Sequence, residues 1–212
     1  MTSRGSVVAS EIVSHHSPQD NVGARMGMWL FLFTELLLFG GLFLLFSVYY
    51  SRFPADFHAG GQALSRILGT VNTVALITSS MTVALAVGFV RRGRIPLSRC
   101  CLLVTIGLAL VFLCIKYVEW SGKIHHGLYP GGPAYLGLPP GQMAFFNMYY
   151  LMTGLHALHV IIGACLLFWV WARMGKGLVT QERHILVENS GLYWHLVDLV
   201  WIYLFPLFYL VV

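Results

Sequence analysis

The stretch GMWLFLFTELLLFGG, residues 27–41, decides the fold. It is almost wholly apolar, and the apolar run continues to Tyr50 without a proline. A helix needs about 20 apolar residues to cross the roughly 30 Å hydrocarbon layer of a membrane. Segment 27–50 is long enough, and Glu35 is its only charged residue. The stretch therefore predicts a membrane-spanning helix.

Four more runs of this kind follow along the chain, at about 67–90, 100–120, 143–172 and 189–212. They are long and do not alternate with a period of two, which favours helices over the strands of a membrane barrel. We expect an all-α polytopic membrane protein with a bundle of five transmembrane helices over residues 25–212. Residues 1–24 are polar and predict an N-terminal tail on the cytoplasmic side.

The composition excludes an ordinary soluble domain. The chain is 58% hydrophobic and 10% charged, with a mean hydropathy of +0.75, whereas a soluble domain carries about 25% charged residues. No basic run with interleaved aromatic residues occurs in a soluble segment, so no nucleic-acid partner is expected. The four cysteines have no metal-ligand spacing and are interpreted as small apolar fillers: Cys100, Cys101, Cys114 and Cys165.

Orientation follows from the lysines and arginines that flank the helices. One predicted side carries nine: Arg4, Arg25, Arg91, Arg92, Arg94, Arg99, Arg173, Lys176 and Arg183. The other side carries three: Arg52, Arg66 and Lys123. The N-terminus is therefore predicted in the cytoplasm and the C-terminus outside.

Glu35 is the most informative intramembrane residue. It lies roughly 12 Å inside its helix, and its own helix offers no partner for a charge. Inserting a charged carboxyl at this depth costs about 2.5–3.5 kcal/mol of free energy on insertion scales. Its presence therefore indicates a structural or functional role. It is either protonated and hydrogen-bonded to a neighbouring helix or ionised beside a partner from another helix. The functional interpretation is a carboxyl that handles protons or binds a partner.

Other polar residues of the runs come in pairs three residues apart, which share a helix face. Lys116 and Glu119 predict an ion pair at the membrane interface, where the lysine reaches toward water. His156 and His159 could ligate haem or a metal together with His195, but interhelical hydrogen bonding is the favoured interpretation. His195 and Asp198 form either one local pair or separate contacts to other helices.

Taken in order, five motifs are similar to those of one family. They are GMWLFLFTE (27–35), VNT (71–73) with Ser79 and Ser80, FLCIKYVEW (112–120), TGLHALHVIIG (153–163) and ENSGLYWHLVDLVW (188–201). Each motif alone is weak, but their order and spacing resemble subunit III of the cytochrome c oxidase family, in its short five-helix bacterial form.

The resemblance implies a fold and a setting. Family members arrange their helices around a V-shaped cleft that holds structural phospholipids. The subunit is non-catalytic and binds no haem or copper, which belong to partner subunits. It packs directly on oxidase subunit I, with subunit II and a small subunit IV as further partners. The implied location is the bacterial cytoplasmic (inner) membrane.

The resemblance also implies roles for particular residues. Glu35 matches a buried carboxyl near subunit I that supports proton uptake. Arg173, fourteen residues beyond His159, matches an arginine that meets a lipid phosphate, and Glu35, His159 and His195 are assigned to lipid binding with it. The remaining intramembrane polar residues are assigned structural roles: Lys116, Glu119, His156 and Asp198.

Several alternatives remain at this point. Subunit III of a quinol oxidase often has an aspartate in place of Glu35, and a helper protein of nitric oxide reductase shares a terminal motif of the Trp-His-Val-Asp type. A haem-binding electron carrier would use the three histidines. An autonomous proton-coupled transporter would use Glu35 and Asp198, although no internal repeat is present.

Overall fold

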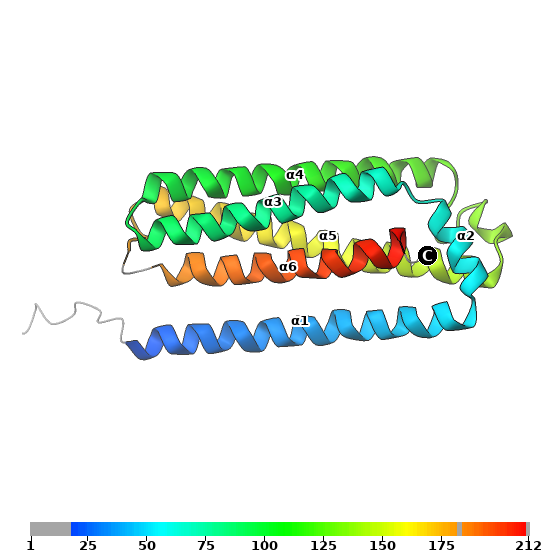
Figure 1. The fold of residues 1–212 in the computed structure, drawn as a ribbon, viewed down its shortest axis with the longest axis horizontal. Coiled ribbons are helices and arrows are strands. Elements are labelled where there is room, and N and C mark those ends of the chain that lie inside the picture. Colours follow the sequence, from blue (N-terminus) through cyan, green and yellow to red (C-terminus); the bar gives the residue numbers. More distant parts are fainter. Residues whose placement is uncertain (1–17, 182–183, 211–212) are drawn as a thin grey trace, which may run out of the picture.

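The computed structural model describes residues 18–181 and 184–210. Within them the chain forms six α-helices and one short 3₁₀ turn, and the long helices run side by side (Figure 1). Their bounds are α1 Pro18–Arg52, α2 Pro54–Gln62, α3 Arg66–Arg91, α4 Ile95–His125, η1 Tyr135–Gly137, α5 Pro140–Gly175 and α6 Ile185–Tyr209.

Five of these helices are long and apolar enough to cross a membrane: α1 from Val22, α3, α4, α5 and α6. The predicted all-α, five-helix polytopic architecture is confirmed. The helices extend beyond the hydropathy runs. α1 begins at Pro18, inside the segment interpreted as a tail, and residues 1–17 of that segment lie outside the described residues. α4 continues to His125, and α5 starts at Pro140, where proline suits a first helical turn.

α6 is the centre of the bundle. It packs on α3, α5 and α1, and it lies between α3 and α1 in Figure 1. In the most apolar window of α6, 56% of the residues are buried, against 17% in α1. α1 contacts the bundle only through α2, α5 and α6 among the described elements with several contacts. Most of its surface therefore faces away from the other helices of this chain.

Close helix approach in the bundle depends on small residues. A Cβ on Gly163 of α5 would lie 2.9 Å from a ring carbon of Trp194 on α6. Trp194 is fully buried, and its indole N–H donates to Ser79 Oγ of α3 at 3.0 Å. Small residues and interhelical hydrogen bonds of this kind are the usual means of helix packing in membranes.

The C-terminal ends of three helices have the same backbone arrangement. α3, α4 and α5 are each followed by a glycine with a positive φ, namely Gly93, Gly127 and Gly177. After each glycine an amide hydrogen-bonds back five residues, as Arg94 N does to Phe89 O at 2.9 Å. This is the Schellman arrangement, which only glycine adopts without strain. These glycines turn the chain sharply. Because α4 and α5 run in opposite directions between them, the connections after α3 and α5 lie at the same end of the bundle as the start of α1 (Figure 1).

Candidate functional site

α1 presents one inward stripe to the bundle, formed by Leu32, Glu35, Phe39 and Phe46. Glu35 Oε2 lies 2.9 Å from Nε2 of His159 on α5. Phe39 packs edge-on against the same imidazole, with ring centroids 5.4 Å apart. The carboxyl thus has a partner from another helix, and apolar rings shield the pair.

The hydrogen bonds of His159 determine the position of one proton and leave two positions for a second. Nδ1 is 2.8 Å from the Leu155 carbonyl, which can only accept, so Nδ1 carries a proton. The short contact from Nε2 to Glu35 then needs one more proton, held either by the imidazole or by the carboxyl. In both forms the pair has no net charge, and the two forms differ only by movement of that proton. Such a pair suits the storage or transfer of a proton within the membrane.

Lys116 and Glu119 form the predicted ion pair, but its setting differs from the prediction. Lys116 Nζ lies 2.9 Å from Glu119 Oε2 and donates to the Tyr209 hydroxyl at 2.7 Å. Tyr209 in turn donates to Glu119 at 2.7 Å. Lys116 is only 3% exposed, and the ring of Trp201 lies 4.8 Å from its ammonium. The expectation that this lysine reaches toward water is wrong, because α4 and α6 enclose the pair.

His156 also departs from expectation. It is fully buried, and neither ring nitrogen has a hydrogen-bond partner among the described residues. Its ring packs against Phe112 and Trp201, with centroids 5.5 and 5.2 Å away. The expected interhelical hydrogen bond is therefore not formed within the described part of the chain, and the histidine serves as a packing residue of the core.

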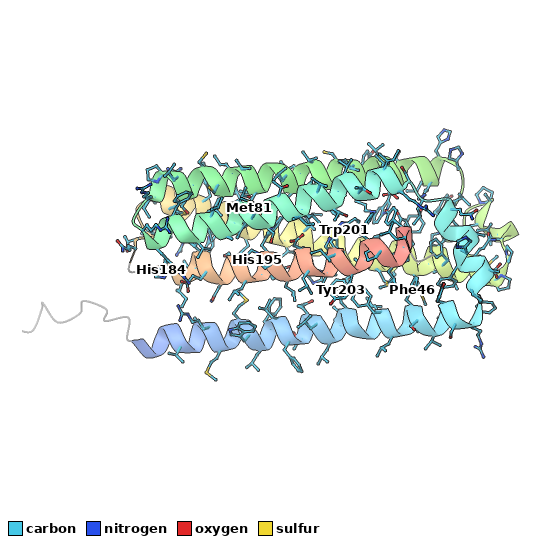
Figure 2. All side chains as sticks on the ribbon, in the orientation of Figure 1. Phe46, Met81, His184, His195, Trp201 and Tyr203 are labelled. Carbon is cyan, nitrogen blue, oxygen red and sulfur yellow. The ribbon has the colours of Figure 1, made fainter. Side chains whose placement is uncertain are left out.

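His195 and Asp198 face α3. His195 Nδ1 lies 2.7 Å from the Ser80 hydroxyl of α3. The Asp198 carboxyl interacts electrostatically with the same serine, although its Oδ1 has no hydrogen-bond partner among the described residues. His195 lies on α6, the helix between α3 and α1 in Figure 2. It lines a cavity of about 260 Å³ between α3 and α6. Arg91 and Glu188 line the same cavity at its far end. Each residue of the pair therefore contacts another helix.

Glu188 is a site that the sequence reasoning missed. Its carboxylate accepts from Arg25 of α1 at 2.8 Å and from Arg91 of α3 at 2.7 Å, and His184 lies 2.9 Å away. The sequence contained one signal that could have identified this cluster. Glu188 is a carboxylate at the start of the last apolar run, on the side predicted to carry most of the arginines. Those arginines were interpreted only as indicators of orientation. The cluster joins α1, α3 and α6 at one end.

Arg173 lies in the last turn of α5, at the same end of the bundle. It is exposed, and its guanidinium stacks over Trp169 at 4.5 Å. Of the four residues assigned to lipid binding, the structure pairs Glu35 with His159. His195 faces α3 instead, and Arg173 lies at the helix end, so the four do not form one site. No group of three metal-ligating side chains occurs within residues 18–181 and 184–210.

Comparison with known proteins identifies the protein family that this chain matches. The family model described as "Cytochrome c oxidase subunit III" matches residues 3–211, nearly the whole chain.

Relatives in several kingdoms agree with it. "Cytochrome c oxidase subunit 3" of Thermostichus vulcanus is 31% identical over 98% of this chain and 95% of its own length. The protein of that name from Mus musculus is 30% identical over 92% of this chain and 72% of its own length. The "Heme-copper oxidase subunit I+III" of Aeropyrum pernix is 32% identical over 92% of this chain, which spans only 23% of that longer protein.

Proposed function

This chain belongs to the cytochrome c oxidase subunit III family, and from that membership we propose that it is the non-catalytic third subunit of a proton-pumping terminal oxidase. As a family member it is a multi-pass membrane subunit of a haem–copper oxidase. The proposal adds that the complex takes electrons from cytochrome c in aerobic respiration, and that this subunit braces subunit I, holds phospholipid and supports proton uptake. The observation that carries the last role is the Glu35–His159 pair.

The partner in direct contact is oxidase subunit I. One relative bears the name "subunit I+III", which indicates a single chain that combines the two subunits. The outward face of α1 is strongly apolar, with Trp29, Leu30 and Phe33 all exposed, and it suits either a membrane-embedded neighbour or lipid. Subunit II and a small subunit IV complete the proposed complex. Haem and copper belong to these partners.

Proton uptake is assigned to Glu35. Its pair with His159 can hold a proton on either member without a net charge, so it can pass protons at low cost in an apolar surrounding. The role proposed is to assist proton entry to subunit I and so to preserve that subunit during turnover.

Phospholipid binding is assigned to two places at the arginine-rich end. Arg173 presents an exposed guanidinium, which binds phosphate oxygens with good geometry. The cavity beside His195 and Arg91 could receive a headgroup between α3 and α6. The proposed membrane is the bacterial cytoplasmic membrane, with the N-terminus in the cytoplasm.

The test is purification through an affinity tag on this chain. We expect a haem-bearing subunit to co-purify and to oxidise reduced cytochrome c. A haem spectrum from the isolated chain would identify an electron carrier instead. Proton transport by the chain alone in liposomes would identify a transporter. Oxidation of quinol but not cytochrome c, or reduction of nitric oxide, would assign the complex to a related oxidase or reductase.

A further inference from the structure

A second cavity lies at the other end of the bundle, between the start of α3 and the end of α4. Its volume is about 280 Å³, and its polar lining comes from Ser65, Glu119, Lys123 and His126. Apolar side chains complete it: Ala63, Leu68, Val118 and Leu128. Nothing in the proposed oxidase function uses this cavity.

Lys123 is the unusual residue of the lining. It is only 8% exposed, although lysine rarely lies so deep. Its ammonium donates to the Ala63 carbonyl at 3.0 Å and lies 5.8 Å from the ring centroid of Tyr149. An ammonium has three donors. No carboxylate of the described residues lies within 4 Å of it, since the described ion pairs are those of Glu35, Glu119 and Glu188 with other cations.

The charges around the cavity do not balance. Lys116, Glu119 and Lys123 are all buried on α4. The Glu119 carboxylate is already occupied by Lys116 and by the Tyr209 hydroxyl. These three groups include two cations and one carboxylate, so Lys123 shares the field of Glu119 with Lys116 and has no carboxylate of its own within 4 Å among the described residues. Buried charges without a counter-charge are costly, and an anion in the adjoining cavity would offset that cost.

Further donors around the cavity suit a phosphate. The Ser65 hydroxyl accepts from Leu68 N as the cap of α3, and its own proton is free to donate to a ligand. The first amides of α3 carry the partial positive charge of a helix N-terminus. His126 lies at the open rim. The apolar remainder of the lining, together with exposed Val118 beside it, suits a glycerol backbone and acyl chain.

We propose that this cavity binds the phosphate of an anionic phospholipid whose headgroup alcohol is uncharged, as in phosphatidylglycerol. Lys123 is its cation. Among the described residues, Glu119 is the only carboxylate in the lining, and Lys116 and Tyr209 already bind it. No carboxylate is thus left there to pair with a headgroup ammonium, which disfavours phosphatidylethanolamine and phosphatidylcholine. The site lies at the end of the bundle opposite Arg173, and neither Glu35 nor His159 is part of its lining.

The test uses the whole complex that contains this chain. Lys123→Met removes the charge and keeps the chain length, Lys123→Arg keeps the charge, and Arg52→Met removes an exposed cation from the same end as a control. Delipidated complexes are titrated with phosphatidylglycerol, phosphatidylcholine or inorganic phosphate, and bound phospholipid is counted by native mass spectrometry.

We expect the wild type, Lys123→Arg and Arg52→Met each to bind one phosphatidylglycerol at this cavity. Lys123→Met should bind that phosphatidylglycerol at least about tenfold more weakly. Equal binding by Lys123→Met would overturn the site. Equal binding of phosphatidylcholine would overturn the anionic selectivity. If inorganic phosphate alone occupied the site in place of phosphatidylglycerol, the ligand would be free phosphate and not a lipid. If Lys123→Met does not assemble, Ser65→Ala gives the same comparison, and unchanged phosphatidylglycerol binding in it would count against the site.

Discussion

At the scale of single residues, two of the intramembrane ionisable groups, Glu35 and Lys116, have ionisable partners, whereas Lys123 has no carboxylate within 4 Å among the described residues. Glu35 finds His159, and Lys116 finds Glu119 and Tyr209. The sequence predicted that Glu35 needs a partner, and it could predict the Lys116–Glu119 pair because those residues share a helix face. It could not identify His159 as the partner of Glu35, because 124 residues separate them and only the packing of α1 on α5 brings them together.

Glu35 provides the first prediction. Glu35→Gln keeps a side-chain hydrogen bond to His159 but cannot release a proton, whereas Glu35→Ala loses both. We expect both variants to leave the haem spectrum of the complex unchanged and to slow proton uptake or shorten turnover lifetime. Only Glu35→Ala should also lose about 1–3 kcal/mol of stability. Wild-type proton uptake and lifetime in Glu35→Gln would remove the proton role.

Lys116 provides a second prediction. Lys116→Met leaves Glu119 buried without its cation, so we expect a loss of about 3–5 kcal/mol of stability. The double variant Lys116→Met/Glu119→Gln removes both charges and should recover part of that loss. Thermal unfolding of the detergent-solubilised complex measures both. Strictly additive losses would contradict the proposed coupling.

Arg173 is predicted to bind a lipid phosphate. We expect Arg173→Ala to lose ordered phospholipid from the purified complex, while Arg173→Lys keeps part of it because a lysine retains the charge without the planar fork. Phosphorus analysis of the purified complexes makes the comparison. Full lipid retention in Arg173→Ala would count against the assignment.

At the scale of elements, α1 stands apart from the other helices. Contacts along its whole length attach it. They include the Arg25–Glu188 ion pair at one end, the Glu35–His159 pair in the middle, and Phe46 at the other end, which packs on Phe57 and Phe208. Hydropathy predicted the five long helices because length and apolarity suffice for that. It did not predict α2, whose nine residues are too short for such a pattern and which is held by the packing of Phe57.

The end contact of α1 yields a fourth prediction. Arg25→Ala should raise amide hydrogen exchange in the first turns of α1 by about two- to fivefold, since a half-exposed ion pair is worth about 0.5–1 kcal/mol. Exchange in α5 should not change. Arg92→Ala, which removes an exposed arginine at the same end, is the control. Equal exchange in the Arg25 and Arg92 variants would show that the ion pair does not hold α1.

At the scale of the whole molecule, the two ends of the bundle differ in charge. The connections after α3 and α5 lie at the arginine-rich end, together with the start of α1, as the spacing of the apolar runs predicted (Figure 1). The cluster around Glu188 and the two cavities were not predicted, because each is formed by residues from at least two separate helices or their connections. Such sites depend on helix rotation, which hydropathy does not determine.

Orientation is the fifth prediction. In a variant whose four cysteines are replaced by serine, a cysteine introduced by His126→Cys should react with a membrane-impermeant thiol reagent added to intact cells. One introduced by Lys176→Cys should react only after the membrane is opened. The physical reason is the excess of arginines at the Lys176 end. The reverse pattern of labelling would invert the topology.

The shared carboxylate of Glu188 also has a consequence for biogenesis. A ribosome makes the chain from its amino end, and Glu188 follows Arg25 by 163 residues and Arg91 by 97. Neither arginine can reach this partner until α6 has been synthesised and inserted. A nascent chain that stops before α6 keeps both arginines uncompensated and α1 without its end contact. Closure of this cluster therefore coincides with completion of the bundle, and a chain that lacks α6 cannot form it.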